Sequence, residues 1–276
     1  QLLNLIKNYF EPLKEKYKWG SNPFYYFAGL NSIHPSFVQE MLNNDSFGPD
    51  DIYSNLKYLS TAGGRKYSKE LITLGKNFYK KVNKGNWKPS LLVNKKNVLI
   101  IGPGQSTIKY KKKLIGFITK HKPVVFVLNA IKPFAEKYID AHIVCHTLRL
   151  LSDINKYKKF NNKLITPYSS FSKNVKSKIK FKNVLNFGLQ VKNNKFKFEK
   201  NYAVLPNSLA ITYALGICTS GQAKKIFLAG LDGYTSDSPK NFQMNELFQN
   251  YRLENNAKAL YTLTPTNYKI KFIKSI

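Results

Sequence analysis

The chain has few cysteines and no long apolar run. Its 276 residues include two Cys, too few for a disulfide framework, and each has apolar neighbours. We therefore predict that Cys145 and Cys218 are reduced core thiols of a cytoplasmic protein. No apolar run approaches the roughly 20 residues of a transmembrane helix. The segment 1–6 has neither a Met nor the order of a signal peptide, so we expect a fragment of a longer protein.

Acidic residues are scarce, and so are arginines. The chain has 45 Lys and Arg against 15 Asp and Glu, a net charge of +30, and only three of the basic residues are Arg. Readers of nucleic acid rely on clustered Arg, so specific nucleic-acid recognition is not predicted. The Lys residues are mixed with Asn along the whole chain, which indicates a compositional bias. The alternative is a positive field that attracts nucleotides, acidic glycans or an anionic membrane surface, which the protein would contact peripherally.

Several catalytic and metal-binding patterns are absent. The chain has no Gly-x-x-x-x-Gly-Lys-[Ser/Thr] loop, which argues against a P-loop kinase, and no Gly-x-Ser-x-Gly elbow of a hydrolase. His142 and His146 stand four residues apart, and a strand would separate them by about 13 Å. With no further Cys, Asp or Glu cluster nearby, no metal site is predicted.

The hydrophobic pattern changes at about residue 91. Residues 1–90 show helical spacing, and 83–90 have the composition of a linker. From 91 to 276, short β-branched runs alternate with helical patterns, which predicts an α/β, Rossmann-like, mainly parallel sheet with helices on both faces. A small helical region precedes this domain. Strands are expected at 98–101, 124–128, 141–145, 164–166, 184–187, 203–205, 226–231 and 269–272, and a helix at 208–215.

The segment after the first expected strand is the strongest sign of a ligand site. Gly102-Pro103-Gly104 is followed by Gln105, Ser106 and Thr107, a pattern in which glycines admit a ligand to the backbone and free N–H groups at a helix start face an anion. A simple turn is the alternative. No later glycine or acid completes the fingerprint of a dinucleotide site, so a classical NAD enzyme is not favoured.

Other polar residues follow the remaining strands. In a doubly wound sheet, ligands sit beyond the carboxyl ends of the strands, so these residues are expected to converge on one edge. Each also has a structural reading, as a turn former or, for the Asn-Ser pair, as a helix cap. The residues expected to bind nucleotide beside the glycine loop are Asn129, His146, Asn207, Ser208 and Asp232.

Five segments carry a family resemblance: NVLIIGPGQST (97–107), FVLN (126–129), NSLAITYALG (207–216), KKIFLAGLDGY (224–234) and KALYTLTPTNYKIKFI (258–273). In this order they resemble the bacterial sialyltransferases that use CMP-sialic acid, and also related motility-accessory and pterin-diphosphokinase-like domains. The resemblance implies that Gly102, Gly104, Gln105, Ser106 and Asn129 hold CMP, with 207–208 at the helix start nearby.

One departure from that family concerns catalysis. The sialyltransferases have a general-base His shortly before the segment that 258–260 match, whereas 249–254 contain none. Acceptor activation needs a base whose pKa lies near the working pH, which an unperturbed Tyr does not offer. Tyr251 and Glu254 are the candidate substitutes.

The front of the chain carries a second resemblance. The segment YKWGSNPFYYFAGLNSIHPSFVQEML (17–42) resembles the tail of a pyruvate-aldolase domain of the 4-hydroxy-2-oxovalerate aldolase type. It implies that 1–90 are the remnant of an aldolase-like lyase fused to a nucleotide-sugar-binding domain at 91–276. Neither a barrel nor a His-x-His metal pair precedes it, so this segment is expected to have no aldolase activity.

Three functional hypotheses follow. The leading one is a sialyltransferase-like domain that binds a CMP-sugar as substrate, with an anionic glycan as acceptor, in surface-glycan or nonulosonate metabolism; a homo-oligomer is compatible with it. The second is a diphosphokinase-like enzyme that uses ATP and Mg²⁺ held by Asp232 and Asp237. The third is a non-catalytic domain that helps the aldolase assemble.

Overall fold

A computed structural model describes residues 82–273, apart from 147–149, 151–152, 172, 180, 182, 193–194 and 237–238. The aldolase-like segment and Asp237 lie outside the described residues, as does nearly all of the expected helical region.

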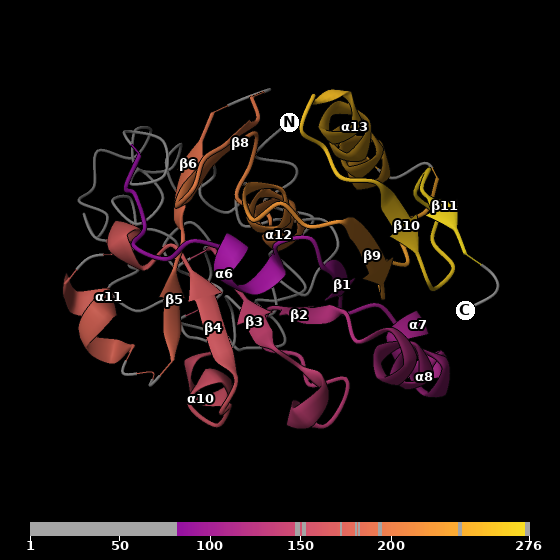
Figure 1. Cartoon of the computed structure of the whole chain (residues 1–276), viewed down its shortest axis with the longest axis horizontal. Coiled ribbons are helices and arrows are strands. Elements are labelled where there is room, and N and C mark those ends of the chain that lie inside the picture. The colour runs from indigo at the N-terminus through magenta and orange to yellow at the C-terminus, as the bar shows by residue number, and fades with distance from the viewer. Residues whose placement is uncertain are drawn as a thin grey trace, which may run out of the picture.

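An eight-stranded parallel sheet forms the centre of the described part (Figure 1). Its spatial order is β11-β10-β9-β1-β2-β3-β4-β5, and every neighbouring pair is parallel. This confirms the predicted α/β, Rossmann-like class. The strands are β1 (Asn97–Ile101), β2 (Val124–Leu128), β3 (Ala141–Ile143), β4 (Lys163–Thr166), β5 (Val184–Asn186), β9 (Lys225–Ala229), β10 (Leu260–Thr262) and β11 (Lys271–Phe272).

Helices cover both faces of this sheet. Figure 1 shows α8 and α10 on one side and α6, α12 and α13 on the other. Alternate residues of β1 divide between two cores: Leu99 packs in the cluster with Leu114 of α8, whereas Ile100 packs in the cluster with α12. The bounds are α6 (Ser90–Val93), α7 (Ser106–Lys109), α8 (Lys111–His121), η1 (Glu136–Tyr138), α10 (Ile154–Tyr157), η2 (Tyr168–Ser170), α11 (Lys173–Lys178), α12 (Ala210–Ser220) and α13 (Pro239–Leu253).

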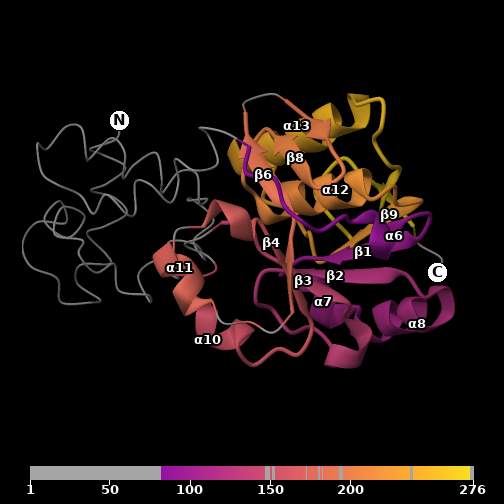
Figure 2. The ribbon, with the colours of Figure 1, turned by 60° about the vertical axis from the view of Figure 1, so that its left-hand side comes forward.

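A second, three-stranded sheet was not expected. It has the order β6-β8-β7, with β6 (Gly188–Val191), β7 (Lys197–Phe198) and β8 (Tyr202–Leu205). Figure 2 shows β6 and β8 near α12, on the side away from α8. The strand expected at 203–205 thus belongs to this sheet and not to the main one. The chain changes sheets at Phe187, whose ring is fully buried.

The segment expected to be a linker is fastened to the second sheet. Asn83 forms a bridge with Leu189, and the Gly85 N–H donates to the Asn201 carbonyl at 3.0 Å. A Cβ on Gly188 would lie 2.8 Å from the Gly85 nitrogen, so a glycine there lets the segment cross. The start of the described chain is therefore part of the folded unit.

Three further details differ from the sequence expectations. β3 ends at Ile143 and not at 145, and α12 runs from Ala210 to Ser220, later than the expected 208–215. β10 was not expected, because its three residues are too few to show a period. Cys145 and Cys218 are free and buried, as predicted. Among the described residues, no helix combines the length and apolar character that a membrane span requires.

Candidate functional site

The carboxyl ends of β1 and β9 lie at the switch point of the sheet. β1 continues through α7 and α8 to β2 on one side, whereas β9 continues through α13 to β10 on the other. Ile101 and Ala229 pair at the ends of these strands, so the loops 102–107 and 230–234 begin side by side. Ligands of open α/β sheets bind at such a switch point, beyond the carboxyl ends of the strands.

The two glycines of the first loop are required by contact with the second loop. The N–H groups of Gly102 and Gly104 donate to the carbonyls of Ala229 and Gly230, both at 2.8 Å. A Cβ on Gly102 would lie 2.5 Å from the Gly230 oxygen, and one on Gly104 would lie 2.5 Å from Cγ of Asp232. We expected these glycines to admit a ligand, but the close approach they permit is that of the neighbouring loop.

The carboxylate of Asp232 occupies the start of α7. Its Oδ2 accepts the Ser106 N–H at 2.9 Å, and its Oδ1 accepts a short hydrogen bond from the Ser106 hydroxyl. The Asp232 carbonyl also accepts the Asn267 N–H at 2.7 Å, which fixes the residue from the other side. The Ser106 N–H, expected to face a ligand anion, is therefore engaged by the protein's own carboxylate.

Neighbouring residues hold this arrangement in place. The Thr107 hydroxyl donates to the Gly102 carbonyl at 3.1 Å. Gly230 has a φ of 65°, and its N–H donates to the Thr264 hydroxyl at 3.0 Å. Gln105 is exposed beside them. The loop 264–267 after β10 thus belongs to the same edge. Sequence reasoning missed it because β10 itself was not expected.

Asn129 has the backbone of a turn residue. Its φ is 58°, its N–H donates to the Ile143 carbonyl at 2.8 Å, and its own carbonyl lies 3.1 Å from Nδ1 of His142. Asn tolerates this left-handed conformation better than most residues. These backbone contacts explain Asn129 as a turn former. They do not involve its side chain, which is half-buried at the carboxyl end of β2.

The loops after β3 and β8 also meet. The Cys145 thiol donates to the Ser208 carbonyl at 2.7 Å, and the next residue, His146, is buried. Oδ1 of Asn207 accepts the Leu209 N–H at 3.2 Å and the Thr212 hydroxyl at 2.7 Å. The N-cap of α12 is nevertheless Leu209, and no side chain caps the helix, so the expected Asn-Ser cap is not formed. The loops that carry His146 and Ser208 therefore touch through Cys145.

Tyr251 and Glu254 lie at the opposite edge of the sheet. The Tyr251 hydroxyl is 2.7 Å from Oγ1 of Thr219, near the end of α12, and accepts the N–H of Lys258, just before β10. Both partners mark the amino edge, and a five-residue strand separates the two edges by roughly 16 Å. Burial raises the pKa of Tyr251 to about 12. The structure does not bring the expected catalytic pair to the glycine loop, and a buried, hydrogen-bonded hydroxyl of this pKa is a poor base.

In the described part of the chain, no group of three or more His, Cys, Asp or Glu side chains is placed to hold a metal ion.

Comparison with solved structures finds a likeness of fold. No family model matches the chain, and no curated protein matches it significantly. The chain is similar to the solved structure of MAf glycosyltransferase from Magnetospirillum magneticum AMB-1, with 10% identity and a TM-score of 0.49. The match covers 73% of this chain and 37% of that one, so the chain spans well under half of its length. We rest the functional proposal on the residues and not on this likeness.

Proposed function

We propose that the carboxyl edge of the sheet, at the loops after β1 and β9, binds a nucleotide-activated sugar of the CMP-sugar type, in a domain related to glycosyl transfer. The observation that supports this is the carboxylate of Asp232, held by Ser106 at the switch point of a doubly wound sheet. The switch point is the usual ligand position in this architecture.

The carboxylate decides which part of the ligand lies against it. A phosphate about 4 Å from Asp232 would be repelled by roughly 4 kcal/mol near a protein surface. Hydroxyl groups are instead donors, and a carboxylate has about four lone-pair positions, of which Ser106 uses two. In the proposed complex, Asp232 therefore accepts hydroxyls of the ribose or sugar. Asn129 and Ser208 position the nucleotide, and the phosphate lies away from the carboxylate in the field of the net charge of +30.

Calorimetric titration of the full chain with CMP and with ATP, each with and without Mg²⁺, tests this proposal. We expect CMP to bind without Mg²⁺, and Asp232→Asn to weaken it by about 10- to 100-fold, the worth of hydrogen bonds to a charged group. Glu246→Gln, which removes the same charge from an exposed position on α13, is the matched control and should bind like the wild type.

Two other outcomes would each select a different function. Binding of ATP only with Mg²⁺ would favour the diphosphokinase-like hypothesis, in which Asp232 and Asp237 would hold the ion. If neither nucleotide binds the folded chain, the proposal is wrong and a non-catalytic role remains.

A further inference from the structure

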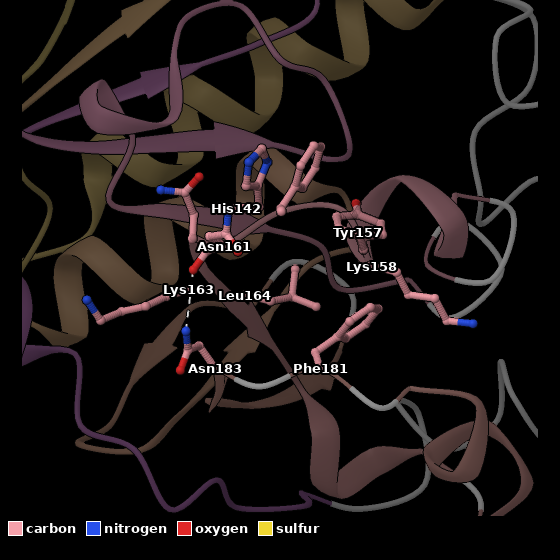
Figure 3. Close-up of a pocket in the computed structure, with 10 residues that line it drawn as sticks. His142, Tyr157, Lys158, Asn161, Lys163, Leu164, Phe181 and Asn183 are labelled. Carbon is pink, nitrogen blue, oxygen red and sulfur yellow. Dashed lines mark hydrogen bonds between the residues drawn. The ribbon is translucent and has the colours of Figure 1, made fainter.

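A pocket of about 270 Å³ lies at the amino end of β4, at the edge of the sheet opposite Asp232 (Figure 3). Lys163 and Leu164 open β4, and Asn183 comes just before β5; both positions mark the amino edge. Asp232 follows β9 at the carboxyl edge. The pocket is therefore separate from Asp232, although His142, which lines it, lies 3.1 Å from the Asn129 carbonyl.

Aromatic rings make up one wall of this pocket. The Phe160 ring stacks on His142, with centroids 4.2 Å apart and planes at 12°. Tyr157 stands edge-on to Phe160 at 6.0 Å and to Phe181 at 6.1 Å. Phe160 and Phe181 are only half-buried, so part of each ring remains open to a ligand. Such a wall favours a flat ring as occupant, because aromatic rings pack in stacked or edge-on pairs.

Two buried acceptors beside the pocket lack donors. Nδ1 of His142 lies 3.1 Å from the Asn129 carbonyl, which can only accept, so in the neutral ring Nε2 carries the lone pair. Burial lowers the pKa of His142 and favours that neutral form. Among the described residues, nothing donates to Nε2 of His142 or to Oδ1 of Asn162. Buried polar atoms are normally satisfied, so a ligand that carries N–H donors suits these two atoms.

Positive charge lies beside the rings. Lys158 and Lys163 line the pocket with exposed side chains, which extend toward opposite sides in Figure 3. Neither forms an ion pair within the described ranges of the chain. An unpaired ammonium at a pocket is suited to a phosphate or carboxylate.

We propose that this pocket is a second ligand site, which takes a nucleoside monophosphate through its base. Its volume is slightly below the 300 to 1,000 Å³ usual for small-molecule sites, so it admits one ring system and leaves the phosphate outside, on the side of Lys158. The amino group of the base supplies a donor for His142 or Asn162, and the ring packs against Phe160 and Phe181.

The test is a titration of the ¹⁵N-histidine-labelled full chain with AMP, followed by NMR. The chain has four His, and the His142→Gln variant assigns the resonance. We expect AMP to shift the Nε2 resonance of His142, and ribose 5-phosphate, which has no base, to leave it unchanged. Phe181→Leu keeps the apolar bulk and removes the ring, and we expect it to raise the Kd for AMP at least about fivefold.

Matched variants separate this proposal from the function proposed above. Lys158→Ala should weaken AMP binding by about two- to fivefold, whereas Lys159→Ala, an exposed neighbour that does not line the pocket, should not. Asp232→Asn should leave the His142 shift intact, whether or not it abolishes CMP binding at the carboxyl edge. No shift of His142 at saturating AMP, or an equal response to ribose 5-phosphate, would overturn the proposal.

Discussion

Substitution of Gly104 by Ala tests the contact between the two loops at the switch point. The new Cβ would lie 2.5 Å from both Cγ and Oδ1 of Asp232 and 2.7 Å from the Gly230 oxygen. Side chains do not tolerate carbon contacts this short, so the Asp232 carboxylate must move. It cannot move freely, because Ser106 holds both of its oxygens.

The magnitude follows from these contacts. Overpacking a tight site costs about 1–3 kcal/mol, and the loss of a hydrogen bond to a charged group costs about 1.5–3 kcal/mol. Asp232 is half-buried, so water can replace part of the lost hydrogen bond. We expect Gly104→Ala to lower the free energy of unfolding by about 2–4 kcal/mol. Urea denaturation followed by far-UV circular dichroism measures it.

Gly116 offers a matched control for this substitution. It is exposed on α8, and a Cβ there would meet nothing within 4 Å. Gly116→Ala should stabilise the protein by about 0.5–1 kcal/mol, since alanine is the better helix former. In an Asp232→Ala background the cost of Gly104→Ala should fall, because two of the three closest atoms are gone. A Gly104→Ala protein within about 0.5 kcal/mol of the wild type would refute the tight contact.

Three further predictions concern the buried polar groups. Tyr251→Phe leaves the Lys258 N–H and the Thr219 hydroxyl without their partner, so the free energy of unfolding, measured by urea denaturation, should fall by about 1–3 kcal/mol. The affinity for CMP, measured by calorimetry, should stay unchanged. Burial lowers the pKa of His142 below its usual 6.5, so the unfolded chain binds the proton more tightly than the folded one. The free energy of unfolding should therefore fall as the pH drops below 6.5, and it should fall less in His142→Gln. Urea denaturation at pH 7.5 and 5.5 measures both changes. Cys145 and Cys218 are buried, and burial raises the pKa of Cys218, so neither thiol should react with Ellman's reagent at pH 8 unless urea unfolds the chain; rapid labelling of the native protein would contradict this.

Local pattern was enough to predict the central strands. β1 and β2 are runs of apolar, mostly β-branched residues, and they are buried on both faces as such runs require. The short strands were harder to predict. β7 and β10 have two and three residues, too few for a period to appear, and the strand expected at 184–187 ends where the chain passes from one sheet to the other.

The candidate site was predicted in its position but not in its chemistry. The rule that ligands lie beyond the carboxyl ends of parallel strands placed Gly104 and Asp232 at one edge, and the structure brings them together. The rule could not predict that Asp232 would accept the Ser106 N–H, which was expected to face an anion. Tyr251 was chosen for its nearness in sequence to a motif, yet α13 carries it to the far edge, where its hydroxyl is satisfied by Thr219.

Local sequence is enough to predict the alternation of strands and helices, the reduced core cysteines and the glycine loop, because each depends on residues near one another in the chain. What faces that loop depends on contacts between distant parts of the chain. Ser106 and Asp232 are 126 residues apart, and their hydrogen bonds exist because β1 and β9 pair in register across the switch point. The pocket at His142 has the same origin, since its walls come from β3, α10, β4 and the approach to β5. Side chains distant in sequence meet only once the strand order is set, and short-range pattern does not encode that order.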